Sequence, residues 1–303
     1  MVKEKRPQRW RIRQSASDRA FDIVNFLLII MVLIVVVYPL YFIVIASFSD
    51  PTLVASGQVV LFPRGINLGG YRLTFQNKDI WRGYANSLFY TVLGTSICLS
   101  CTVPAAYALS RRDLVGRGVL MKLITFTMFF SGGLIPSYLL IQKLKIYNTV
   151  WALTLPFAVN VYNLIIARSF MIENIPMELH EAAQLDGCGD FKFFFRIVLP
   201  LAKPVVCVLL MMYAVEHWNS YFYALIYLKD RELFPLQMIL RELLIQTEMV
   251  GSMGGDSTVM QMQQIANMLK YCVIIVSSLP LLILYPFIQK YFEKGLTIGA
   301  VKG

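Results

Sequence analysis

The sequence predicts an all-α integral membrane protein with six transmembrane helices and with both termini in the cytoplasm. Of its 303 residues, 57% are hydrophobic and only 15% are charged, which is more apolar surface than a soluble core needs. The apolar residues gather in runs of more than about 18, the length that crosses a bilayer. The Lys and Arg residues behind the net charge of +10 lie between these runs, so the charge indicates membrane topology and no nucleic-acid partner.

The six apolar runs divide the chain into a short first segment, a helical domain and a tail. We expect helices at 23–45, 84–109, 119–141, 150–171, 198–222 and 268–288. They lie in a transmembrane domain at 21–292, between a cytoplasmic segment at 1–20 and a cytoplasmic tail at 293–303. The first run is too long for the core of a signal peptide and no clear cleavage site follows it, so we expect an uncleaved anchor. Pro104 predicts a kink in the second helix.

The distribution of basic residues predicts the orientation. An even number of spans puts both termini on the same side of the membrane. Lys and Arg are more frequent in the first segment, the 110–122 loop, the 173–200 loop and the tail than in the three opposite loops. By the positive-inside rule, these richer segments face the cytoplasm.

One polar stretch between the last two spans has helical periodicity. From Pro235, five apolar residues recur on one face: Leu236, Ile239, Leu240, Leu243 and Leu244. An amphipathic helix on the outer surface lies at the membrane interface or helps to receive a partner from outside, and the pattern leaves both open.

The most specific pattern lies in the loop at 173–200. Pro176 suits the first turn of a short helix, and Gly187 suits the left-handed residue just past its end. Between them, we expect a short helix with an apolar stripe of small residues, formed by Leu179, Ala182, Ala183 and Leu185, and with acidic residues at Glu178, Glu181 and Asp186. A short helix of this kind, placed between membrane spans, offers a contact to a protein outside the bilayer.

The spacing of this loop resembles the EAA loop of permease subunits in bacterial ABC importers. Glu-Ala-Ala, three residues, Gly, nine residues and Ile-x-Leu-Pro are all matched between Glu181 and Pro200. The resemblance implies that this helix docks in a cleft of a cytoplasmic ATPase. The residues expected to carry ATPase coupling are Glu178, Glu181, Ala182, Ala183, Asp186, Gly187, Leu199 and Pro200.

Three motifs that suggest catalysis or metal binding are incomplete. His180-Glu181 begins a zinc-protease helix, but Gln184 stands where the second ligand must be. No GxxxxGK[ST] phosphate loop occurs, so the chain is not expected to hydrolyse ATP by itself. Cys98 and Cys101 lie inside an apolar span with no second pair to complete a zinc site. We therefore expect no catalytic residue, no metal ligand and no bound cofactor, and an intramembrane enzyme is disfavoured.

Polar residues in the fifth span predict a substrate path. The candidates are Glu216, His217, Trp218, Asn219, Tyr221 and Tyr223. Ionisable groups in hydrocarbon are costly and usually face water or a partner. Aromatic faces stack on sugar rings while amide and carboxylate groups bind hydroxyls, so the set suits sugars. Pairing between helices, or a position at the outer interface, explains the same residues without a path.

A wider resemblance covers nearly the whole chain. The end of the chain is similar to that of maltose-type sugar permeases of the MalG kind, and the segments 18–22 and 38–41 resemble the LplC-like or YtcP-like oligosaccharide subgroup. It implies the type I ABC importer permease fold. It also implies ATPase contacts from the tail, through Gly295, Gly299, Lys302 and Gly303.

The same resemblance implies a set of partners in a bacterial cell membrane. They are a second, homologous permease subunit, two cytoplasmic ATPases that hold ATP and Mg, and an extracytoplasmic binding protein that delivers an oligosaccharide. A permease for a non-sugar solute remains an alternative. A secondary transporter is disfavoured because the sequence has no internal repeat.

Overall fold

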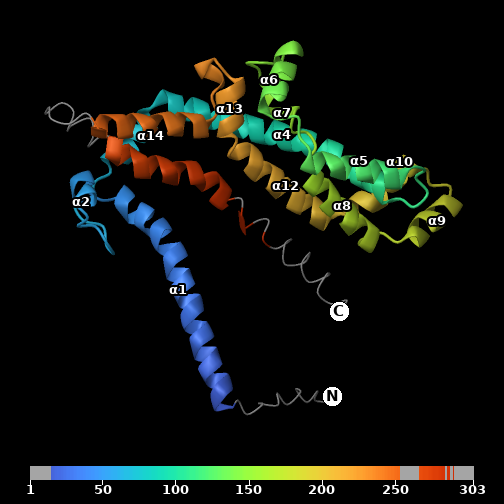
Figure 1. Ribbon diagram of the computed structural model, residues 1–303, viewed down its shortest axis with the longest axis horizontal. Coiled ribbons are helices and arrows are strands. Elements are labelled where there is room, and N and C mark those ends of the chain that lie inside the picture. Colours follow the sequence, from blue (N-terminus) through green and yellow to red (C-terminus); the bar gives the residue numbers. More distant parts are fainter. Residues whose placement is uncertain (1–14, 253–265, 284, 287–288, 290–303) are drawn as a thin grey trace, which may run out of the picture. The chain divides into compact units, whose positions relative to one another are not determined.

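The computed structural model describes residues 15–252, 266–283, 285, 286 and 289. Within these ranges every regular element is a helix and no strand occurs, as expected (Figure 1). The chain divides into two compact units, one ending at Leu68 and the other beginning at Gly69.

The first unit is dominated by the helix α1 (Ala16–Ser47), which covers the first expected span. Ser15 and Asp18 form a reciprocal capping box at its start, which satisfies backbone N–H groups that no helical carbonyl can reach. Its 32 residues extend about 48 Å at 1.5 Å per residue, more than a bilayer core requires. The short helix α2 (Pro51–Ala55) follows, capped by Asp50.

The second unit is organised around the helix α4 (Lys78–Ser110), which contains the second expected span. It packs against α8 (Val161–Asn174), α12 (Lys203–Trp218) and α14 (Leu236–Ser252), and Figure 1 shows these helices beside it. Glycine permits the close approach, because a Cβ on Gly94 would come within 2.5 Å of the ring of His217 in α12. Pro104 lies inside α4, and the kink expected there stays a prediction.

The third expected helix, 119–141, is wrong as a single element. The structure has α5 (Arg117–Phe129) and α6 (Leu134–Lys143), which meet at an angle of 110°. Gly133 takes a φ of +86° at the break, a conformation that residues with a Cβ rarely adopt. The adjacent glycines Gly132 and Gly133 therefore end one helix and start another.

The fourth and fifth expected helices are also interrupted. The fourth becomes α7 (Trp151–Thr154) and α8, separated at Pro156, with Asn160 capping α8. The fifth bends by 78° at Ala202 and then continues as α12. It breaks again before α13 (Tyr221–Tyr227). Prolines lie at the first two breaks: Pro156 lies just beyond the end of α7, and Pro200 and Pro204 lie on either side of Ala202. Proline donates no N–H and its ring crowds the carbonyl four residues earlier, so it disturbs the hydrogen bonds of a continuing helix.

The number of spans stays a prediction. Among the described residues, three helices are long and apolar enough to cross a membrane: Ser17–Ser47, Lys78–Ser110 and Ala266–Ile283. The count rises to five if each bent pair is one span. The helix α8 has only 14 residues, or about 21 Å, which is shorter than a bilayer core.

The remaining elements are short. They are α3 (Gly69–Gln76), α9 (Met177–Leu185), α10 (Asp190–Phe193), the π-helix η1 (Phe194–Val198), α11 (Leu199–Leu201) and the 3₁₀-helix η2 (Arg231–Leu233). The expected amphipathic helix is present as α14, with Leu236, Ile239 and Leu240 buried. Two buried clusters fill the second unit: one around α14 and α13, the other where α4 and α8 meet the segment 190–209.

Candidate coupling site at the end of helix α4

The helix α9 forms where the sequence predicts a short helix. It begins after Pro176 and ends at Leu185. The N–H of Cys188 donates to the carbonyl of Ala183 at 2.8 Å, and the N–H of Gly187 donates to that of Gln184 at 2.9 Å. This pair of bonds is a Schellman motif, which requires the left-handed φ of +73° that Gly187 adopts. The expected conformation of Gly187 is thus confirmed.

Most of α9 is exposed. Only His180 and Ala183 are buried, on one face of the helix. The opposite side carries the exposed acids and apolar residues, and Leu185 is 91% exposed. Of the residues expected to carry ATPase coupling, Ala183 is buried, Leu199 is half-buried and six are exposed: Glu178, Glu181, Ala182, Asp186, Gly187 and Pro200.

The apolar side of α9 is therefore not its buried side. The stripe expected from Leu179, Ala182, Ala183 and Leu185 contributes only Ala183 to the core. The imidazole of His180 takes the inner place instead, with its ring edge-on to Phe193 at 4.9 Å between centroids. An exposed apolar stripe on a nine-residue helix is a surface suited to a partner.

His180 connects α9 to the end of α4. Its Nε2 lies 2.8 Å from Nη1 of Arg111 and 3.0 Å from Oδ1 of Asp190. The neutral ring can either accept a hydrogen bond from Arg111 or donate one to Asp190 through this atom. Its Nδ1 is buried without a hydrogen-bond partner. Histidine thus bridges the arginine and the carboxylate from inside.

Arg111 lies at the centre of this group. Nη1 also donates to Oδ1 of Asp190 at 2.8 Å and to the hydroxyl of Tyr107 at 3.1 Å, while Nε donates to Oδ1 of Asp113 at 2.9 Å. The hydrogen bonds from Arg111 lower the pKa of Asp113 to about 2, and those from His180 and Arg111 lower the pKa of Asp190. Both carboxylates therefore stay charged at neutral pH.

Two further arginines cap the last carbonyls of α4. Nη1 of Arg117 donates to the carbonyls of Ser110 and Arg111 at 3.4 and 3.2 Å. Nε of Arg168, from α8, donates to the carbonyl of Leu109 at 3.0 Å. Cations stabilise a helix C-terminus because its free carbonyls carry partial negative charge. The end of α4 is therefore fixed by side chains from two other segments.

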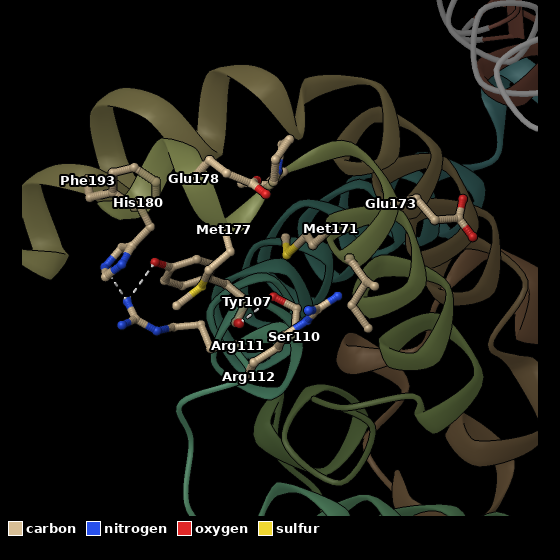
Figure 2. Close-up of a pocket in the computed structure, with 13 residues that line it drawn as sticks. Tyr107, Ser110, Arg111, Arg112, Met171, Glu173, Met177, Glu178, His180 and Phe193 are labelled. Atoms are coloured by element: carbon tan, nitrogen blue, oxygen red, sulfur yellow. Dashed lines mark hydrogen bonds between the residues drawn. The ribbon is translucent and has the colours of Figure 1, made fainter. Parts of the chain in front are cut away.

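A pocket of about 260 Å³ opens beside this group, between the ends of α4 and α8 and the start of α9 (Figure 2). Figure 2 shows Arg111 extended from the end of α4 toward Tyr107 and His180. Apolar and acidic side chains share the wall, among them Met171, Met177 and Glu173.

The candidate path residues separate into two groups. His217 is buried against Gly94 and Cys98, with Nε2 3.5 Å from Sγ of Cys98. Trp218 is also buried, and its Nε1 donates to the carbonyl of Ser277 at 3.2 Å. Tyr221 is half-buried; three residues remain exposed: Glu216, Asn219 and Tyr223.

The tail residues Gly295, Gly299, Lys302 and Gly303 lie outside the described residues, so their expected contacts stay a prediction. The contacts of Arg111, His180 and Asp190 were not predicted from the sequence. One signal was available. His180 is one of only two histidines in the chain, and it lies three residues before Ala183 on the same face of the helix.

The described part of the chain combines helices long enough to cross a membrane with a short, exposed and capped helix, an arrangement that fits a membrane transport permease. The chain belongs to the family described as binding-protein-dependent transport system inner membrane component, which it matches over residues 11–298. This family consists of transport subunits, and its name implies a binding protein as a partner.

Three relatives support this assignment. The chain is 40% identical to the polygalacturonan/rhamnogalacturonan transport system permease protein YtcP of Bacillus subtilis (strain 168), over 95% of this chain and 100% of the relative. It is 39% identical to the protein LplC of the same organism, over 96% and 98%. It also matches a chain of a bacterial ABC transporter involved in the import of the acidic polysaccharide alginate. That match has a TM-score of 0.84 and 32% identity over 93% of this chain and 99% of the other. The fold is therefore that of a type I ABC importer permease.

Proposed function

We propose that the chain is a permease subunit of a bacterial ABC importer that takes up oligosaccharides delivered by an extracytoplasmic binding protein. The observation that carries the proposal is α9, a helix with an exposed apolar and acidic surface, fixed at one end by a Schellman motif and on its inner face by His180. Such a helix can transmit a displacement because it is short, capped and attached to a long helix.

The proposed partners follow from this surface and from the family. Two cytoplasmic ATPases bind and hydrolyse ATP with Mg, and the cleft of one receives α9. The exposed carboxylates of Glu178, Glu181 and Asp186 suit basic or polar groups on the ATPase. The chain itself holds no nucleotide and no metal in this proposal. A second, homologous permease subunit completes the pathway, in the bacterial plasma membrane.

In this scheme, transport occurs because the path through the helices opens first to one side of the membrane and then to the other. Closure of the ATPase dimer on ATP displaces α9, and the helices attached to it switch between outward and inward arrangements. The tail at 293–303 extends to the same ATPases. Both termini are cytoplasmic in the proposed six-span topology.

The substrate class rests on the relatives and on the fifth span. One similar protein is named for the transport of polygalacturonan and rhamnogalacturonan, and another belongs to an importer of alginate, which supports a substrate built of sugar units. The exposed Glu216, Asn219 and Tyr223 are the residues of the candidate set that remain available to line a path. A ring face stacks on a sugar, and amide and carboxylate groups bind its hydroxyls.

Reconstitution tests the proposal directly. The chain is co-expressed with its partner permease, ATPase and binding protein, and the complex is placed in proteoliposomes. ATP hydrolysis is then measured with the binding protein loaded with uronate oligosaccharides, with neutral oligosaccharides or with nothing. Stimulation of hydrolysis and uptake by one class identifies the substrate. Uptake driven by an ion gradient without ATPase would refute the proposal and favour a secondary transporter, and uptake of a non-sugar solute alone would refute the sugar assignment.

A further inference from the structure

Arg111 joins three segments through a single side chain. Its guanidinium contacts Tyr107 in α4, His180 in α9 and Asp190 at the start of α10, and it also binds Asp113 in the following loop. The side chain of Arg111 is only 16% exposed, while the side chains of Asp113 and Asp190 reach the solvent.

Arginine is suited to this position in a way that lysine is not. The contacts to Asp113 come from Nε and Nη2 together, while Nη1 faces His180, Asp190 and Tyr107. A planar guanidinium presents five donors in a fixed arrangement, whereas an ammonium is a compact charge with three rotating donors. Lysine could keep the charge but not the simultaneous contacts.

The inner attachment of α9 depends on few side chains. Within the described part of the chain, His180 and Ala183 are its only buried residues, and Ala183 has no polar group in its side chain. The hydrogen-bonded attachment of α9 to α4 therefore passes through His180 and Arg111. Because Arg117 and Arg168 hold the last carbonyls of α4, a displacement at Arg111 acts on a fixed helix end.

The helix α4 is the element best placed to distribute such a displacement. It packs against α8, α12 and α14, so its movement changes the contacts of three other helices. At Gly94, α4 packs directly against the ring of His217 in α12, with no room even for an added Cβ. Packed helices of this kind move together or change between discrete arrangements.

We propose that Arg111 is the positioning residue that transmits the displacement of α9 to α4 through His180 and Asp190. It thereby couples ATP hydrolysis to the arrival of substrate-loaded binding protein. This inference rests on the proposed function. It adds a residue in the loop after α4 to the coupling machinery, separate from the exposed surface of α9 that faces the ATPase.

The test uses the reconstituted complex and the ratio of ATP hydrolysis with substrate-loaded binding protein to hydrolysis without it. Arg111→Ala should leave co-purification of the ATPase intact, because the exposed face of α9 is unchanged, but should reduce the ratio at least fivefold, toward one. Arg111→Lys should restore little of the ratio. Arg112→Ala, at the exposed neighbour that makes none of these contacts, is the matched control and should keep the ratio of the wild type.

A double-mutant cycle tests the route. His180→Ala and the double variant Arg111→Ala/His180→Ala should give the same low ratio as Arg111→Ala alone, since each interrupts the same attachment. The inference would be overturned if the reductions of the ratio in the two single variants multiplied in the double variant. A normal ratio in Arg111→Ala would overturn it as well. Loss of the ATPase in both Arg111→Ala and Arg111→Lys would also overturn it, because the residue would then serve assembly only. A wild-type complex with no stimulation would instead refute the proposed function, on which the inference depends.

Discussion

Two separate constraints, backbone conformation and space in the ATPase cleft, favour glycine at position 187. Its φ of +73° is left-handed, and no other atom lies within 4 Å of the position that a Cβ would take. Within this chain a side chain at 187 would therefore be strained by the backbone alone. In an assembled transporter, the same side chain could also crowd the cleft that receives α9.

The expected magnitude follows from the conformation. A residue with a Cβ pays roughly 1–2 kcal/mol in the left-handed region, while asparagine tolerates it better. Gly187→Ala should thus weaken the Schellman motif by roughly 1–2 kcal/mol, or about 5- to 30-fold in the opening equilibrium of the last turn of α9. Gly187→Asn should cost less, and Gly187→Val more, because a β-branched residue is least compatible with this φ.

Hydrogen exchange of the amides at 185–188 in the purified complex measures this opening. Gly118→Ala is the control, since Gly118 lies in α5, has ordinary φ and has nothing within 4 Å of its added Cβ. It should leave exchange at 185–188 unchanged. Exchange in Gly187→Ala that equals the wild type would refute the backbone argument. If transport falls further with Asn than with Ala although amide exchange rises less, crowding in the cleft is the dominant cause.

Further predictions concern Gly94, Glu181 and the tail. Gly94→Ala should destabilise the complex by about 1–3 kcal/mol because the new Cβ would overlap the rigid ring of His217, whereas Gly118→Ala should not; a melting temperature that is unchanged in Gly94→Ala would contradict the packing. Glu181→Lys should release the ATPase while the permease still inserts, and intact co-purification with normal transport would disprove the docking role. Deletion of 298–303 should leave insertion intact and weaken the stimulation of ATP hydrolysis by substrate; an unchanged ratio would show that the tail is dispensable.

The sequence predicts helices well where the apolar run is uniform. The helices α1 and α4 form as expected, because hydrophobic side chains extend through them without a pair of glycines. The third run is also largely apolar, yet Gly133 adopts a left-handed φ and divides it. Composition measures whether a segment can enter a membrane, but it does not show where the segment bends.

In the candidate site, too, local features could be predicted from the sequence and long-range contacts could not. The cap at Gly187 follows from local rules, because a Schellman motif depends on consecutive residues. The contact between Arg111 and His180 joins residues 69 positions apart, so no local pattern contains it. For His217 and Trp218 the sequence left open a path or a pairing between helices, and both residues pack against neighbouring helices, α4 and the helix Ala266–Ile283, an arrangement that only the tertiary structure decides.

The arginines that cap α4 have a consequence for the biogenesis of the protein. Arg117 and Arg168 bind the carbonyls at 109–111, and Arg117 also belongs to the basic loop from which the orientation is inferred. In the proposed topology, such a charge helps to keep its loop on the cytoplasmic side while the chain enters the bilayer. In the folded chain, it caps the end of α4. Replacing Arg117 to study insertion would therefore disturb the mature fold as well.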